Sequence, residues 1–243
     1  MIMTPASSDS TQNKPTVESD TNLSPKDADG GFGWWTKTLQ YKTGLGLNED
    51  QKKDYVEEAK MRKQLEACKS CEENRDWMMK YSPTVVFMLE QIRKIGGDVP
   101  RERVKCDICT EPKYGGFHPD LGIQLCYNYI PDKWVLNDTL AHELVHEYDN
   151  TRFKVDWMDI RHHACSEVRA ASLSGECAIM TEFWRWMGTM RVAKGHQQCV
   201  KRKAVLSVIG HPKCKSKEHA EEIVDEVFRS CFNDTRPFER IYR

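Results

Sequence analysis

The 243-residue chain lacks both a surplus of charge of one sign and any long run of apolar residues. Lys and Arg total 36 against 37 Asp and Glu, and a formal net charge of −1 argues against a general nucleic-acid-binding surface. Uninterrupted apolar runs, such as residues 85–89, are far shorter than the roughly 20 residues of a membrane-spanning helix. The composition therefore excludes polytopic membrane proteins and predicts a globular protein without a nucleic-acid partner.

Targeting signals and several catalytic motifs are missing as well. The first 30 residues contain no Arg, and no basic segment in them is followed by an apolar one. These features predict neither a secretory signal nor an Arg-rich mitochondrial presequence. The chain also contains no G-x-S-x-G motif, phosphate-binding loop or dinucleotide-binding glycine motif, which disfavours serine hydrolases and nucleotide-dependent enzymes.

The N-terminal part of the chain divides into a tail and a helical region. Residues 1–30 are mainly Ser, Thr, Asp, Asn, Pro and Lys, which is typical of a disordered tail. Residues 31–97 form the predicted N-terminal helical region. Helices are expected over 48–80, with Asn48 near the N-cap, and over 83–95, where Gly96 and Gly97 follow as a stop signal.

The remaining residues, 98–243, form the predicted core, in a single domain with the preceding helices. Short alternating runs between 98 and 131 predict a small β-hairpin or sheet. A helix is expected over 139–149 with Asp138 as its N-cap, and further helices are expected over 160–172, 176–190, 197–208 and 218–230. These elements predict an α+β, mainly helical fold with a small sheet and an N-terminal helical extension.

The segment TLAHELVHEYD contains His142, Glu143 and His146, which form an H-E-x-x-H pattern. Residues four apart on a helix are separated by about 40° around its axis, so both imidazoles can bind one metal ion. Glu143 can then flank the metal and act as general base toward a water molecule. The apolar residues around the motif favour this interpretation, because buried His and Glu are costly without partners. The pattern predicts one Zn²⁺ per chain in a zincin-like metalloprotease domain.

A catalytic zinc ion needs a third protein ligand, which the motif does not supply. The metzincin spacing would require Gly at position 149 and His at 152, whereas the chain has Asp149 and Arg152. A Glu about 20 residues farther on, in a second helix, would fit the gluzincin arrangement, and Glu167 has this spacing. Glu167 is therefore the predicted third ligand. The alternatives are Asp149, Asp156, His162 and His163.

The ten cysteines allow either disulfides or a structural metal site. Two C-x-x-C pairs, Cys68/Cys71 and Cys106/Cys109, could form a four-thiolate zinc site. The 34 residues between the pairs include a predicted helix, which favours disulfides over such a site. We therefore expect most or all of the cysteines to be oxidised.

Six collinear blocks resemble a known family. The chain is similar to the mitochondrial inner-membrane metalloproteases that process a mitochondrially encoded subunit of the F-type ATP synthase, in particular to their fungal members. The resemblance covers nearly everything after residue 30 and rests on the blocks GFGWWTKTLQYKTGLGL, RDWMMKYSPTVVFM, GGFHPDLGIQLCYN, DTLAHELVHEYD, HHACSEVRAASLSGEC and DEVFRSCFNDTRPFERIYR.

The resemblance implies more than the spacing does. It implies a peripheral protein on the intermembrane-space side of the mitochondrial inner membrane, imported through the disulfide relay of that compartment. The resemblance also implies that the substrate is the precursor of ATP synthase subunit 6 (subunit a), and that the protein removes the N-terminal presequence of this precursor. It also implies a role with the assembly intermediates of the ATP synthase membrane sector. His142, Glu143 and His146 fall on the family's metal, base and metal positions.

Two classes of function fit these expectations. The first is a zinc metalloendopeptidase with Glu143 as the catalytic residue and His142, His146 and Glu167 as metal ligands. The second is a non-enzymatic assembly factor that keeps a structural metal site. Zinc content alone does not separate the two, whereas peptide cleavage that depends on Glu143 does.

Overall fold

The computed structural model describes residues 32–177 and 192–239. These residues fall into two compact units, which divide between Ala59 and Lys60. The predicted disordered tail of residues 1–30, and nearly all of the helix predicted over 176–190, lie outside the described residues. No helix among the described residues has the length and apolar character needed to cross a membrane.

The first unit contains the helix α1, Phe32–Thr43, and the beginning of α2, Glu49–Tyr81. Tyr55 of α2 stacks on the rings of Trp34 and Tyr41 of α1, with centroids 4.9 and 4.6 Å apart. At the start of α2, Asn48 and Gln51 form a reciprocal capping pair. The predicted cap near Asn48 is therefore confirmed, and aromatic stacking joins the two helices of this unit.

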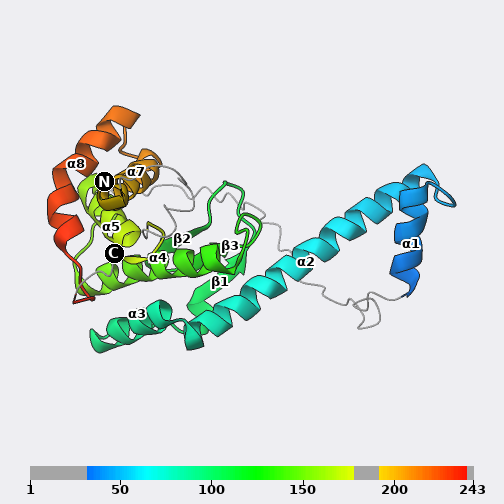
Figure 1. Ribbon diagram of the computed structural model, residues 1–243, viewed down its shortest axis with the longest axis horizontal. Coiled ribbons are helices and arrows are strands. Elements are labelled where there is room, and N and C mark those ends of the chain that lie inside the picture. Colours follow the sequence, from blue (N-terminus) through cyan, green and yellow to red (C-terminus); the bar gives the residue numbers. More distant parts are fainter. Residues whose placement is uncertain (1–31, 178–191, 240–243) are drawn as a thin grey trace, which may run out of the picture. The chain divides into compact units, whose positions relative to one another are not determined.

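In the second unit, a small sheet packs against α4, Lys133–Arg152, and so do α3, Pro83–Lys94, and α5, Ile160–Leu173 (Figure 1). The sheet contains β1, Val104–Asp107; β2, Gly115–His118; and β3, Gly122–Cys126. Its order is β1-β3-β2, with β1 parallel and β2 antiparallel to β3. Further helices are α7, Val192–Ile209, and α8, Lys217–Asn233. The predicted α+β, mainly helical fold with a small sheet is confirmed.

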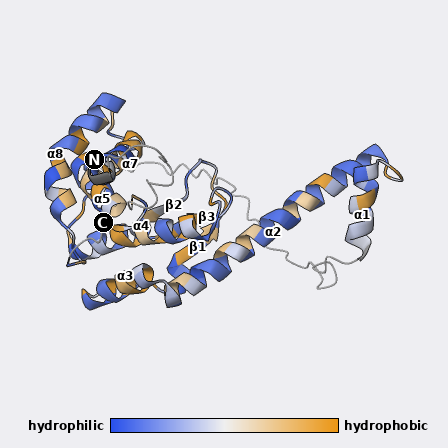
Figure 2. Ribbon diagram, in the orientation of Figure 1, coloured by the Kyte–Doolittle hydropathy of each residue, from blue (hydrophilic) through white to orange (hydrophobic). Residues whose placement is uncertain are grey.

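Two hydrophobic clusters form the interior of the second unit. The first joins the end of α2, α3, the sheet and α4, and includes Met78, Val85, Leu125 and Leu144. The second joins α5, α7 and α8. Along α8, hydrophilic residues alternate with the buried hydrophobic ones in Figure 2. Helix α5 packs against α4 and contributes to both clusters, with Ala170 and Leu173 in the first and Ala164 and Val168 in the second.

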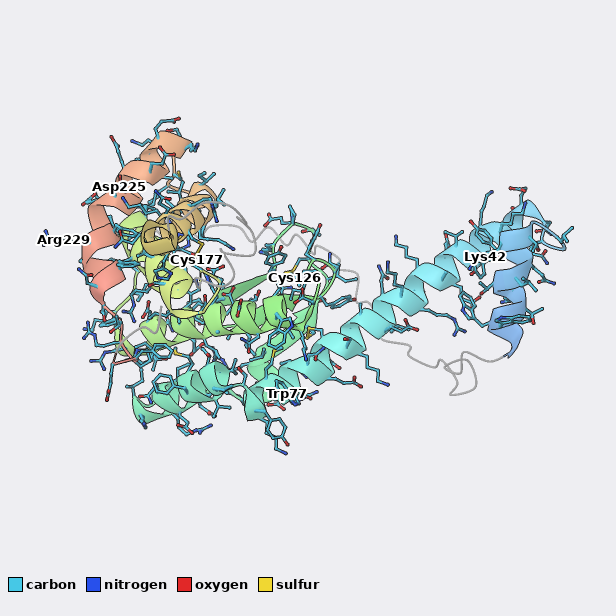
Figure 3. The ribbon with its side chains drawn as sticks, viewed as in Figure 1. Lys42, Trp77, Cys126, Cys177, Asp225 and Arg229 are labelled. Atoms are coloured by element: carbon cyan, nitrogen blue, oxygen red, sulfur yellow. A yellow bond between two sulfur atoms is a disulfide. The ribbon has the colours of Figure 1, made fainter. Side chains whose placement is uncertain are left out.

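Eight of the ten cysteines form four disulfides, as expected for most of them. The pairs are Cys71–Cys106, Cys109–Cys126, Cys165–Cys231 and Cys177–Cys199, whereas Cys68 and Cys214 are free thiols. Figure 3 labels Cys126 and Cys177. Of the two C-x-x-C pairs, Cys71, Cys106 and Cys109 are in disulfides and Cys68 is free, so no four-thiolate metal site forms from them. Each disulfide restricts the unfolded chain and so favours the folded state.

The start of α4 differs from the prediction. The helix begins at Lys133 instead of Thr139, because the Asp132 side chain accepts hydrogen bonds from the backbone N–H groups of Trp134 and Val135. Asp138, the predicted N-cap, lies within the helix. Burial raises the pKa of the Asp138 carboxyl to about 6. Asp138 could cap only a helix that begins beside it, whereas α4 begins after Asp132.

Asp132→Ala should destabilise the fold by about 1 kcal/mol, because it removes the cap of α4. Asp138→Asn should instead stabilise the fold near pH 7 to 8. The folded-state pKa of Asp138 lies above its unfolded value, so ionisation costs stability progressively as pH rises from about 4 to beyond 6, and the amide avoids this cost.

Thermal unfolding of the two variants at pH 4 and pH 8 measures both effects. The Asp138→Asn gain should be larger at pH 8 than at pH 4. An equal loss of stability in both variants at both pH values would contradict this assignment of the cap.

Candidate metal centre

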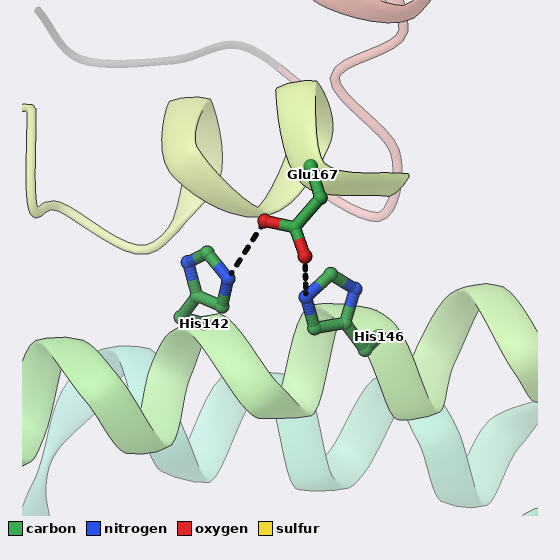
Figure 4. A group of neighbouring side chains, drawn as sticks. All are labelled: His142, His146 and Glu167. Carbon is green, nitrogen blue, oxygen red and sulfur yellow. Dashed lines mark ion pairs between the residues drawn. The ribbon is translucent and has the colours of Figure 1, made fainter. Parts of the chain in front are cut away.

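The candidate site lies where α4 and α5 face each other. His142 and His146 are one turn apart on α4, and Glu167 projects toward both of them from α5 (Figure 4). One ligand atom from each of the three residues lies within 4.8 Å of the others. The two helices thus bring together residues separated by at least 20 positions in the sequence.

The distances between donor atoms fit one shared metal ion. The Glu167 carboxylate oxygens lie 3.5 Å from His142 Nε2 and 3.4 Å from His146 Nε2. Zinc binds nitrogen and oxygen at about 2.0 to 2.2 Å, so tetrahedral ligands lie about 3.3 to 3.6 Å apart. Two imidazoles and one carboxylate are also a donor set that divalent transition metals accept. The residues present therefore fit a metal ion.

The second nitrogen of His146 is held by polar groups behind the site. His146 Nδ1 lies 2.8 Å from Ser166 Oγ, and that hydroxyl donates a hydrogen bond to Asp149 Oδ2 at 3.0 Å. Because the Ser166 proton is used in this way, the hydroxyl accepts a hydrogen bond from His146 Nδ1. The Nε2 lone pair of His146 is then directed at the cluster, where a metal ligand needs it.

Asp149 has a structural role in this arrangement. Its carboxylate forms an ion pair with Arg169 at 3.0 Å, and both side chains are 3% exposed. The Arg169 guanidinium also donates to the backbone carbonyl of Asp234 at 2.6 Å. Burial raises the pKa of Asp149, and Arg169 opposes that effect. Asp149 thus joins α4, α5 and the C-terminal segment and lies outside the three-residue cluster.

The other alternative ligands also lie outside the cluster. Asp156 is exposed, and its Oδ1 accepts a hydrogen bond from the Met158 backbone N–H. The Nδ1 atom of His162 accepts one from the Asp156 backbone N–H. His163 is nearer, with Nε2 3.2 Å from Glu167 Oε1, and its buried Nδ1 has no hydrogen-bond partner among the described residues. His163 therefore contacts the predicted ligand Glu167.

Glu143 lies beside the cluster and is 6% exposed. Burial raises the pKa of its carboxyl, while His142 and His146 act in the opposite direction. A raised pKa brings a carboxylate closer to the range in which it can accept a proton and return it near neutral pH. The position and environment of Glu143 are those that a general base requires.

Opposite charges perturb the pKa values of two cluster residues, His142 and Glu167. Burial alone would lower the pKa of His142, but the carboxylates of Glu176 and Glu167 outweigh it and raise the pKa well above its usual range. Burial would likewise raise the pKa of Glu167, yet His146 and the other histidines hold it well below its usual range. The site therefore concentrates negative charge around imidazole groups, which favours a bound cation.

A cavity of about 350 Å³ opens beside these residues. The β2 strand and α7 contribute further walls, and the lining outside α4 and α5 includes Tyr114, Gly115, Phe117, Trp157, Lys203 and Ser207. Gly115 is required for the close approach of β2 to α4, because a Cβ there would lie 2.7 Å from Thr139 Cγ2 and 3.2 Å from Glu143 Oε1. The cavity therefore leaves open space beside His142, Glu143, His146 and Glu167.

Sequence reasoning missed the residues that surround the cluster. Ser166 is adjacent to Glu167, but nothing in its spacing indicates a contact with His146. Glu176 and Lys203 also lie at the site, and no helical periodicity connects them to α4. Their positions depend on how α5 and α7 pack, which local patterns do not encode.

Glu167→Ala should weaken metal binding by about 10-fold or more, because it removes one of three donors, and His146→Ala should have a comparable effect. Asp156→Ala is the matched control, since it removes an exposed carboxylate outside the cluster, and it should leave metal binding nearly unchanged. Metal content of the purified proteins, together with competition against a chelator, measures the difference. A larger loss in Asp156→Ala than in Glu167→Ala would overturn the ligand assignment.

Comparison with known proteins is consistent with this site. Residues 69–239 match the Peptidase M76 family. Proteins named mitochondrial inner membrane protease ATP23 are similar over 88% of the chain: 56% identical in Eremothecium gossypii, 54% in Kluyveromyces lactis and 53% in Saccharomyces cerevisiae, covering 90%, 90% and 96% of those proteins. No solved structure matches the chain. The predicted metalloprotease family is confirmed, and the chain belongs to the Peptidase M76 family and is a metallopeptidase.

Proposed function

We propose that the protein is a zinc endopeptidase of the mitochondrial inner membrane, acting on the intermembrane-space side. The observation that carries this proposal is the cluster of His142, His146 and Glu167, with Glu143 beside it in one cavity. Zinc is the proposed ion because two histidines and one glutamate are a common ligand set of catalytic zinc in peptidases.

Each residue of the site has a proposed role in peptide hydrolysis. His142 and His146, whose Nε2 atoms face Glu167, would hold the ion, and the Glu167 carboxylate would complete the ligand set. Zinc, when bound, acts as a Lewis acid that polarises the scissile carbonyl and activates water at neutral pH. Glu143 accepts the proton of the attacking water and delivers it to the leaving amine. The cavity between β2, α4 and α7 holds the peptide segment.

The location is supported by two observations. The similar fungal proteins are named mitochondrial inner membrane proteases. Four disulfides form in the chain, and disulfides persist in oxidising compartments and are rare in reducing ones. The proposal therefore includes import through the intermembrane-space disulfide relay and a peripheral contact with the inner membrane.

The proposed substrate is the precursor of ATP synthase subunit 6 (subunit a), from which the enzyme removes the N-terminal presequence. The support is the resemblance of the six sequence blocks to the family that performs this cleavage. A second part of the proposal is that the protein promotes assembly of the ATP synthase membrane sector. Binding of an apolar subunit depends on surface shape, whereas cleavage depends on proton transfer, so the two activities can be separated.

Glu143→Gln should leave the subunit 6 precursor uncut, because the amide has nearly the same volume but does not accept a proton. General acid–base catalysis contributes about 10²- to 10⁴-fold in rate, and the loss should be at least of this size. Zinc content and thermal stability should remain near those of the wild type. Assembly of the ATP synthase membrane sector should continue at least in part.

The test uses purified protein with a peptide spanning the presequence junction, and cells with each variant at matched protein level. His146→Ala is the comparison, because loss of the ion should impair both activities. Normal cleavage by Glu143→Gln would refute the catalytic assignment. Complete loss of assembly in a folded, zinc-loaded Glu143→Gln protein would refute the separate assembly role.

A further inference from the structure

His142 is bound on both of its ring nitrogens by carboxylates from different parts of the chain. Nε2 faces Glu167, and Nδ1 lies 3.0 Å from Oε1 of Glu176, a residue in the turn that follows α5. Both side chains of the second contact are largely buried, at 17% and 16% exposed. This differs from His146, whose Nδ1 is held by the hydroxyl of Ser166.

The contact with Glu176 determines which nitrogen of His142 carries a proton. An ionised carboxylate only accepts hydrogen bonds, so His142 Nδ1 must donate to it. In the neutral imidazole this leaves the lone pair on Nε2, which is the atom that faces Glu167 and the proposed ion. Glu176 therefore both selects the tautomer of His142 and limits rotation of its ring.

Glu176 is itself fixed from α7. Its Oε2 forms an ion pair with Lys203 Nζ at 2.8 Å, so one carboxylate bridges His142 of α4 and Lys203 of α7. The next residue, Cys177, forms a disulfide with Cys199, which precedes Lys203 by one turn of α7. The side chain of Glu176 and the backbone beside it are thus both attached to the same helix.

We propose that Glu176 is a positioning residue for the metal ligand His142, and that Lys203 acts through Glu176 to hold it in place. The inference rests on the proposed zinc site, and it extends that site to a third helix. Carboxylates that bind the second nitrogen of a histidine ligand raise the basicity of the ligand and hold its orientation. Their loss typically costs about 10- to 100-fold in metal affinity.

The rival interpretation is that Glu176 and Lys203 form only a structural ion pair between the turn and α7. In that case, removing the pair would lower the stability of the metal-free fold without changing the affinity for zinc. The two interpretations therefore predict different changes in two measurable quantities, the zinc affinity and the melting temperature of the metal-free protein.

The test measures zinc affinity by competition with a chelator, and thermal unfolding with and without zinc, for the full chain. Glu176→Ala should weaken zinc binding by about 10-fold or more. Glu176→Gln should weaken it less, because the amide oxygen can still accept from Nδ1 but carries no charge. Lys203→Met should also weaken zinc binding, by less than Glu176→Ala, since the carboxylate remains but loses its restraint.

Lys201→Met is the matched control. Lys201 also lies on α7, and it forms an ion pair with the carboxylate of Asp225 on α8. Figure 3 labels Asp225. Lys201 and Asp225 are both absent from the lining of the cavity. This variant should keep wild-type zinc affinity, so the comparison separates loss of any α7 ion pair from loss of the one that reaches His142.

The inference is overturned if Glu176→Ala and Glu176→Gln both bind zinc within about twofold of the wild type, whatever their metal-free stability. If Glu176→Ala does not fold, then wild-type zinc affinity in both Glu176→Gln and Lys203→Met also overturns the inference. Failure of the proposed peptidase function would give a different result: the wild-type protein would bind zinc but would not cleave the peptide. Wild-type protein that does not bind zinc would overturn both.

Discussion

The contact between α4 and α5 buries ionisable side chains that need one another. His142 and His146 come from one helix and Glu167 from the other, and all three lie largely out of water. Burial of such groups is costly unless charges are paired or bind a metal ion. Because α4 contributes to the first hydrophobic cluster of the second unit and α5 to both clusters, the chemistry of the site and the packing of the core depend on the same helix pair.

Two different polar systems support the cluster from behind. On one side, His146 is held by Ser166, which leads to Asp149 and Arg169 and from there to the C-terminal segment. On the other side, His142 is held by Glu176. Metal ligands whose second nitrogen is bonded in this way are oriented before the ion arrives, which lowers the cost of binding it. A residue far from the ion can therefore change the affinity of the site.

The sequence could predict those parts of the site that follow from one helix. The H-E-x-x-H spacing places His142 and His146 on one face because the geometry of a helix is local. The prediction of Glu167 as a ligand required only that a second helix pack against the first. The structure brings Glu167 to the cluster. Helices α2, α3, α5, α7 and α8 and the small sheet also follow from local patterns, whereas α1 was not predicted as a separate helix. The roles of the four residues in binding and catalysis stay predictions.

Contacts between distant segments could not be predicted in the same way. Asp138 has the residue type of a cap, yet Asp132 provides the cap, and only the actual start of α4 distinguishes them. The cysteines within each C-x-x-C pair are close in sequence, but Cys71 bonds to Cys106 of the other pair, Cys109 bonds to Cys126, and Cys68 stays a free thiol. Glu176 reaches His142 through the packing of α5 and α7, for which the sequence has no periodic signal.

X-ray absorption at the zinc edge of the loaded protein, combined with anomalous diffraction, identifies the neighbours of the ion and locates it. We expect only nitrogen and oxygen neighbours at about 2.0 to 2.2 Å, and an anomalous peak between His142, His146 and Glu167. Sulfur neighbours at about 2.3 Å, or a peak away from the contact between α4 and α5, would show that zinc does not bind at these three residues.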